Sequence, residues 1–140
     1  MKISPVFILS SVLLVACSSA SSDEDAVREL FTRAEAAAEA RDAGDVLELV
    51  ADDYADAQGR TRADLRPALA AWFATHAHPE LVTSIDELRF PVADYARARV
   101  TVRGLELDRF DFGETLVLDV ELRREAGEWR ITRADRARER

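Results

Sequence analysis

Cysteine and histidine are scarce in this chain of 140 residues, which contains one cysteine, Cys17, and two histidines, His76 and His78. A single cysteine cannot form an intramolecular disulfide. Histidines two positions apart do not share a face of a helix, and no second cysteine is present to complete a metal-ligand set. We therefore expect no metal and no cofactor in this protein.

Glycine is also scarce, with five residues, and the motifs that depend on it are missing. The sequence contains no glycine-rich phosphate loop, no Gly-x-Ser-x-Gly turn and no cysteine–histidine couple. Basic residues number 19 against 27 acidic ones, a net charge of −8. Because nucleic-acid binding is driven by neutralising phosphates, this balance argues against a nucleic-acid partner. We interpret the locally basic residues 133–140 as a solvent-exposed end of the chain, and contact with anionic lipid head groups is the alternative.

The only long apolar run lies at the N-terminus and ends at Cys17. It is about half the ~20 residues that a membrane-spanning helix needs, so a permanent transmembrane anchor is not expected. A basic residue at Lys2, a short apolar stretch and small residues at its end are typical of a signal peptide. The final four residues, Leu14-Val15-Ala16-Cys17, resemble the lipobox of bacterial lipoproteins.

The lipobox resemblance implies cleavage before Cys17, lipid such as palmitate on its thiol, and acylation of the new amino terminus. Several acyl chains on one residue give stable membrane anchoring. Ser18 stands where an aspartate would signal inner-membrane retention, so the resemblance implies an outer-membrane lipoprotein facing the periplasm, with the inner membrane or cell surface as alternatives. The other reading of Cys17 is a small core residue or a free thiol in a cleaved leader.

The same reading divides the chain into four parts. Residues 1–16 form the signal peptide, and residues 17–22 the lipidated cysteine and a flexible tether of small polar residues. Residues 23–134 form one domain, and residues 135–140 a charged tail.

The first half of that domain has apolar residues at helical spacing and predicts three helices. We expect Ser22 to cap the first helix, Gly44 to stop it and Asp45 to cap a short second helix. Thr61-x-x-Asp64 is the pattern of a capping box for the third helix. One face of the third helix carries Leu65, Leu69, Trp72, Phe73 and His76.

Beyond Pro79 the period changes from helical to alternating, which is typical of half-buried antiparallel strands. Strands are expected over 81–90, 96–102 and 116–122 and from Trp129, with a long hairpin loop over 105–113. Helices followed by an antiparallel sheet make an α+β fold.

Several short motifs, in their order along the chain, resemble the nuclear transport factor 2-like superfamily, whose cystatin-like cone is also found in polyketide cyclases. They are Arg41-Asp-Ala-Gly-Asp-Val46, Asp53-Tyr54-x-Asp56, Gly59-Arg60-Thr61, Tyr95-Ala-Arg-Ala-Arg-Val100 and Gly127-Glu-Trp-Arg-Ile131. The resemblance implies three N-terminal helices packed on a curved antiparallel sheet that wraps the first helix. The departure is a strand pair expected between the second and third helices, which is hardly visible in this sequence.

Enzymes of this superfamily place an Asp, His or Tyr inside the cone, so polar groups on inward positions are the ones to find. The predicted strands offer none, because their inward positions are all apolar. The opposite positions carry charges that can form cross-strand ion pairs. We interpret this charged set as a solvated face, with a polar dimer interface as the alternative. Its members are Arg97, Arg99, Arg103, Asp119, Glu121 and Arg123.

Three residues remain as pocket candidates, Tyr54, Trp72 and His76. Tyr54 can reach a pocket mouth or close an edge of the core. His76 shares a stripe with Trp72 and could act as a general base near neutral pH, or could cap the end of its own helix. No catalytic residue is assigned.

The sequence therefore favours a lipid-anchored envelope protein with a non-catalytic domain that binds a small apolar ligand or a protein partner. The alternative is a small cofactor-independent hydrolyase or isomerase acting on a hydrophobic substrate in the cone. The membrane, reached through the lipid anchor, and a second copy of the chain are the other partners expected.

Overall fold

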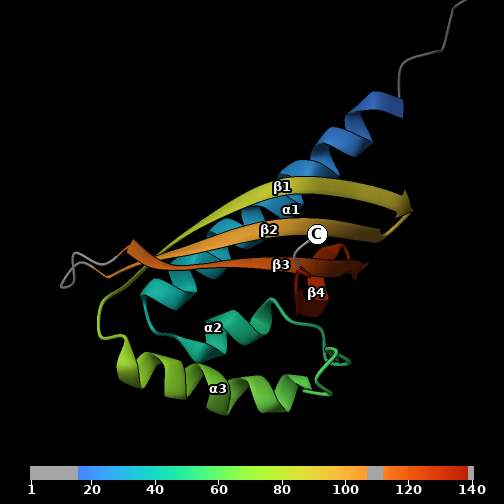
Figure 1. Cartoon of the computed structure of the whole chain (residues 1–140). Helices are drawn as coiled ribbons and strands as arrows, with labels where there is room; N and C mark the ends of the chain where they lie inside the picture. The colour runs from blue at the N-terminus through green and yellow to red at the C-terminus, as the bar shows by residue number, and fades with distance from the viewer. Residues whose placement is uncertain (1–15, 107–111, 139–140) are drawn as a thin grey trace, which may run out of the picture.

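The computed structural model describes residues 16–106 and 112–138, which form three helices followed by four strands (Figure 1). The elements are α1 (Ala16–Glu39), α2 (Ala43–Glu48), α3 (Arg62–Thr75), β1 (Pro79–Val92), β2 (Tyr95–Glu106), β3 (Phe112–Glu125) and β4 (Glu128–Arg136). All four strands belong to one antiparallel sheet in the order β1-β2-β3-β4. The predicted α+β class, with three helices on a curved antiparallel sheet, is confirmed. Part of the predicted loop over 105–113 lies outside the described residues.

Helix α1 begins earlier than the sequence predicted. It starts at Ala16 and not at Ser22, so the residues predicted as a flexible tether, 17–22, are helical in the structure. Alanine and serine have no steric bar to a helix, and Asp23, Glu24 and Asp25 continue it without a break. A cap at Ser22 was therefore the wrong interpretation of a serine inside a continuous helix.

The break between α1 and α2 lies at Arg41, whose φ of 57° is in the left-handed region, and not at Gly44. Asp42 is the N-cap of α2, since its Oδ1 accepts the Asp45 backbone N–H at 3.0 Å. Gly44 is inside α2, and Asp45 is in its first turn and does not cap it. By contrast, the capping box between Thr61 and Asp64 at the start of α3 is confirmed.

The sheet has one apolar face and one charged face, as the alternation predicted. Its inner face packs against α1, and the buried core cluster combines both elements. That cluster contains Val27, Leu30, Phe31, Leu49, Ala96, Ala98, Val100, Val120, Leu122 and Trp129. Helix α2 contacts α1, and α3 contacts α2 at the side away from the sheet (Figure 1).

The strand pair that the sequence barely indicated is present in reduced form. Val50 makes a single parallel bridge to Ile131 on β4, and Ala55 makes an antiparallel bridge to Thr61. The Ala51 N–H donates to the Ile131 carbonyl at 2.9 Å. Residues 50–61 therefore close the β4 edge with isolated bridges, too short to give an alternating pattern.

Candidate functional site

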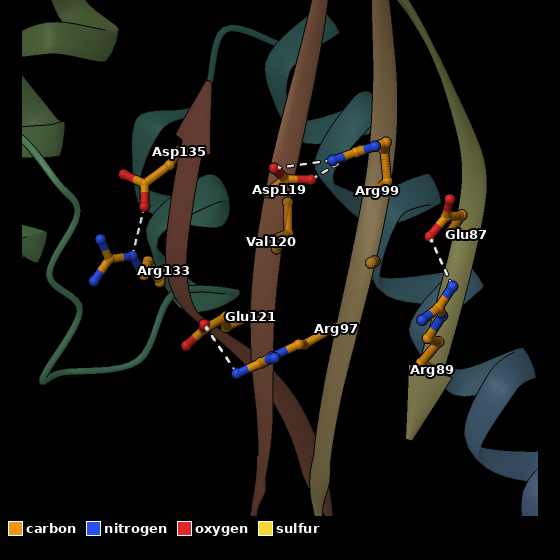
Figure 2. Close-up of a pocket in the computed structure, with 10 residues that line it drawn as sticks. Glu87, Arg89, Arg97, Arg99, Asp119, Val120, Glu121, Arg133 and Asp135 are labelled. Carbon is orange, nitrogen blue, oxygen red and sulfur yellow. Dashed lines mark hydrogen bonds and ion pairs between the residues drawn. The ribbon is translucent and has the colours of Figure 1, made fainter. Parts of the chain in front are cut away.

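An open hollow lies on the outer, charged face of the sheet (Figure 2). It has a volume of about 450 Å³. Its lining consists of charged side chains from all four strands with two small apolar residues: Glu87, Arg89, Arg97, Ala98, Arg99, Asp119, Val120, Glu121, Arg133 and Asp135.

The register of the sheet arranges these charges in two rows that cross the strands. The first, which we call the acidic row, places Glu87, Arg99, Asp119 and Asp135 opposite one another in that order. The second, the basic row, places Arg89, Arg97, Glu121 and Arg133 opposite one another. Along each strand the two rows are two positions apart, with one inward-facing residue between them, which corresponds to roughly 7 Å.

The two rows carry opposite net charge. Three acids and one arginine make the acidic row negative, and three arginines and one glutamate make the basic row positive. Each row also contains one directly opposed pair of like charges, Asp119 with Asp135 and Arg89 with Arg97. Such pairs destabilise a sheet when nothing compensates them.

The carboxylates of the acidic row are compensated within the chain. Arg99 binds Asp119 with two hydrogen bonds of 2.9 and 3.2 Å, the bidentate geometry that guanidinium and carboxylate favour. Asp135 accepts the Ala57 backbone N–H at 2.7 Å and the Arg133 Nε–H at 2.5 Å. The Ala57 N–H, together with Arg133, holds the pKa of Asp135 below its usual range in spite of some burial.

The directly opposed arginines of the basic row are less well compensated. Arg89 and Arg97 have side chains that are 76% and 64% exposed. The nearest carboxylate contacts are 3.4 Å from Arg89 Nη2 to Glu87 and 3.9 Å from Arg97 Nη2 to Glu121. In Figure 2 the two guanidinium groups turn away from each other, toward these two acids.

A buried carboxylate stabilises the loop that borders the hollow beside β4. The Asp56 side chain is fully buried, and it accepts hydrogen bonds from the backbone N–H groups of Gln58 and Arg60, both at 3.0 Å. Arg60 Nε also donates to it at 2.7 Å. Burial acts to raise the pKa of Asp56, but the hydrogen bonds and charge of Arg60 and the Gln58 N–H outweigh it and lower that pKa.

Tyr54 closes this edge of the core and does not line the hollow. It is 4% exposed, and its hydroxyl lies 3.3 Å from both Asp56 Oδ2 and the Ala134 carbonyl. Burial, with the nearby Asp56 charge, raises the pKa of Tyr54 to about 12. At neutral pH the tyrosine is therefore a neutral hydrogen-bond donor that ties the 54–60 loop to β4.

Trp72 and His76 lie together at the end of α3, remote from the lining of the hollow. Their rings stack with centroids 4.3 Å apart, and His76 Nδ1 lies 2.8 Å from the Trp72 carbonyl oxygen. His76 is the C-cap residue of α3, which corresponds to the capping alternative considered for it. A role of Tyr54, Trp72 or His76 in binding a ligand stays a prediction.

Sequence reasoning found half of the rows and missed the other half. It identified Arg97, Arg99, Asp119 and Glu121 from the alternation in two strands. It missed Glu87 and Arg89 on β1 and Arg133 and Asp135 on β4, because a register shift in each strand breaks the alternation and turns these side chains to the outer face. Arg103 and Arg123, which it included, do not line the hollow.

Neither a metal cluster nor a membrane-spanning helix is found in the part of the chain that the structure describes. No group of three or more His, Cys, Asp or Glu side chains there is arranged to hold a metal ion. No helix among residues 16–106 and 112–138 is long and apolar enough to cross a membrane. Cys17 lies near the start of α1, and its lipidation stays a prediction.

Comparison with solved structures finds the same arrangement of helices and sheet in other proteins. A protein of unknown function with a cystatin-like fold from Nostoc punctiforme has a TM-score of 0.71 and 17% identity, covering 83% of this chain and 90% of that chain. A protein whose name contains NTF2 has a TM-score of 0.65 and 17% identity, covering 82% and 99%. A scytalone dehydratase-like protein from Novosphingobium aromaticivorans has a TM-score of 0.68 and 12% identity, covering 84% and 85%.

Comparison of the sequence gives no such match. No protein-family model matches the chain, and no curated protein is similar to it in sequence. Likeness at these identities establishes a fold and leaves activity open. The chain has the α+β cone of the nuclear transport factor 2-like and cystatin-like folds, which can serve as a ligand-binding or an enzymatic domain.

Proposed function

We propose that this chain is a lipid-anchored envelope protein whose cone binds a protein partner through the outer face of its sheet, without catalysing a reaction. One observation carries the proposal. Eight ionisable side chains from all four strands line an open hollow on the outer face, whereas the buried inner face is apolar and packed against α1. Charged, well-exposed surfaces of this kind select protein partners by electrostatic complementarity.

The character of the hollow favours a protein partner over a small apolar ligand. Pockets for small apolar molecules are mostly lined by hydrophobic and aromatic side chains. Eight of the ten lining residues here are arginine, aspartate or glutamate, and the hollow is open to solvent. A partner's surface can supply the opposite charges that such a lining requires.

The ionisation of these groups also supports binding over catalysis. A general base works best when its pKa lies near the operating pH. Hydrogen bonds and arginine charges instead keep the pKa of Asp135, in the hollow, and of Asp56, beside it, below the usual range. The hydrolyase or isomerase alternative draws support from the fold alone, which a scytalone dehydratase-like protein shares.

Lipid on Cys17 would complement this mode of binding. Anchoring confines both molecules to one membrane surface, which raises their effective concentration and makes weak recognition sufficient. An exposed polar face is suited to contacts of that strength.

Site-specific photo-crosslinking tests the proposal. A benzophenone amino acid replaces the exposed Glu87, at the border of the hollow, or as a matched control the exposed Glu29 on α1. We expect Glu87 to give a discrete crosslinked band with one envelope protein in intact cells, and Glu29 to give none. Equal crosslinking from both positions, or no adduct from Glu87, would contradict binding through the outer face.

A further inference from the structure

We infer that the two charged rows form a dipolar docking site for an extended segment of the protein partner. That segment carries an acidic side chain over the basic row and a basic side chain over the acidic row, two residues apart. The inference rests on the proposed function, because it assigns the chemistry of the segment that the outer face would bind.

The spacing of the rows is the first argument. In an extended chain, side chains two positions apart point to the same side and lie roughly 7 Å from each other. The acidic and basic rows are separated by the same two-residue step along β1, β2, β3 and β4. A segment that runs along the strands can therefore place one side chain over each row at once.

The opposed arginines are the second argument. Arg89 and Arg97 stand directly opposite each other, are mostly exposed, and lie no closer than 3.4 Å to a carboxylate. In Figure 2 their guanidinium groups diverge, each toward its own acid, which keeps the two like charges apart. A carboxylate placed between the guanidinium groups would remove the repulsion and could accept hydrogen bonds from both.

Arg97 is partly positioned for that contact. Its Nε donates to the Tyr95 hydroxyl at 3.1 Å, and its guanidinium carbon lies 5.6 Å from the centre of the Tyr95 ring. These contacts restrict the stem of the side chain, so less conformational entropy is lost when a ligand binds. Tyr95 therefore acts as a positioning residue for Arg97.

The acidic row would bind the basic side chain of the segment. Asp119 and Asp135 are directly opposed, and together with Glu87 they outweigh Arg99, the one arginine of that row. Asp119 and Asp135 already accept hydrogen bonds from Arg99, Arg133 and the Ala57 N–H, but each carboxylate has further acceptor sites, to which a lysine or arginine head group can still donate. Because this row repels a second negative charge, the site favours a dipolar segment over phosphate or a polyanion.

The test is an NMR titration of the full chain in uncharged detergent with short blocked peptides. The probe is acetyl-Gly-Lys-Gly-Glu-Gly-amide, and the comparison ligands are the peptides with Lys-Gly-Lys and Gln-Gly-Gln centres and inorganic phosphate. We expect saturable shifts of the Arg89 and Arg97 side-chain signals with the Lys-Gly-Glu peptide and weaker binding of the other three ligands. Binding should weaken by about tenfold in R89Q and in R97Q, the loss of one charge-assisted hydrogen bond.

Arg103→Gln is the matched control, since Arg103 is an exposed arginine on β2 outside the hollow and should change affinity less than twofold. Equal weakening in R103Q, equal binding of phosphate or the Lys-Gly-Lys peptide, or no shift at millimolar peptide would overturn the inference. These results are separable from those for the proposed function. A Glu87 crosslink without peptide binding refutes only the dipolar site, whereas peptide binding without a crosslink refutes the envelope partner.

Discussion

Asp56 shows how a single side chain can hold together a loop that has little regular structure. Its carboxylate is fully buried and accepts hydrogen bonds from the Gln58 and Arg60 N–H groups and the Arg60 side chain. Aspartate is rarely buried unless it is paired. No local pattern therefore separates Asp56 from exposed neighbours such as Asp52, and only the three-dimensional closure of the loop distinguishes the two.

Tyr54 extends this network to β4, and its hydroxyl makes stability sensitive to alkaline pH. Its pKa of about 12 in the folded protein lies above the ordinary value of 10. Between these values the unfolded chain loses the proton first, so the unfolded state binds fewer protons and stability falls as pH rises. We therefore expect the contribution of Tyr54 to the free energy of unfolding to be fully present below pH 10 and to decrease as the pH rises above it.

Tyr54→Phe tests both parts of this account by urea unfolding at several pH values from 7 to 11. The variant should lose about 1 kcal/mol at pH 7, because the hydroxyl proton that Asp56 Oδ2 and the Ala134 carbonyl share is removed. Above pH 10 its stability should fall less steeply than that of the wild type. A variant with the same alkaline slope as the wild type would show that another group is responsible.

At the scale of elements, strand faces could be predicted from the sequence where no register shift interrupts the alternation, whereas strand register could not. An alternation of period two assigns each residue to a face, and this correctly separated Ala96, Ala98 and Val100 from Arg97 and Arg99. Which charges stand opposite one another depends on bulges and turns. β1 has an irregularity between Ile85 and Glu87, which sets the pairing of Arg89 with Arg97. No local sequence pattern predicts that register shift.

Helix ends, too, include some that the sequence predicts and some that it does not. The capping box at Thr61 and Asp64 is a local hydrogen-bonding motif, so it could be read directly. The break after α1 occurs at Arg41 in a left-handed conformation, which glycine usually supplies. Tertiary contacts override the local preference there, because the Arg41 side chain reaches α3 and donates to the Phe73 carbonyl at 2.9 Å.

The turn between β3 and β4 offers a test at this scale. Ala126 and Gly127 have φ values of 49° and 81°, which is the pattern of a type I′ hairpin turn. Asparagine tolerates this conformation at the first position far better than alanine does. Ala126→Asn should therefore raise the free energy of unfolding by about 1 kcal/mol, measured by urea denaturation.

Gly127→Ala is the control for the turn and should lower stability by a similar amount, since it forces a side chain into the left-handed region. The two changes are on adjacent exposed residues and touch no part of the hollow. If Ala126→Asn is neutral or destabilising while Gly127→Ala is harmful, the type I′ assignment is wrong.

For the whole molecule, the order of weak motifs was enough to predict the fold, and neighbouring structures of 12–17% identity confirm it. The same features could not give the site. The hollow is assembled from strands spread over residues 87–135. Its charged residues form rows only because the register of the sheet places them opposite one another. The predicted membrane address depends on different residues, those around Cys17, and is independent of the fold.

That address is tested by Cys17→Ala. Without the thiol, the predicted lipid cannot be attached, and the protein should move from the membrane fraction to the soluble fraction or remain uncleaved. Metabolic labelling with an alkyne-bearing palmitate analogue should mark the wild type and not the variant. Unlabelled wild-type protein with unchanged fractionation of the variant would rule out the lipoprotein assignment, leaving the fold untouched.

The central claim is that the outer face of the sheet is covered by a partner in the cell envelope, and the most direct measurement is differential labelling of its arginines. Phenylglyoxal modification of isolated membranes and of the purified full chain, read by mass spectrometry, gives a rate for each arginine. We predict that Arg89 and Arg97 are modified several-fold more slowly in membranes, while the exposed Arg66 on α3 reacts equally in both. Equal rates for all three arginines in the two preparations would contradict the account.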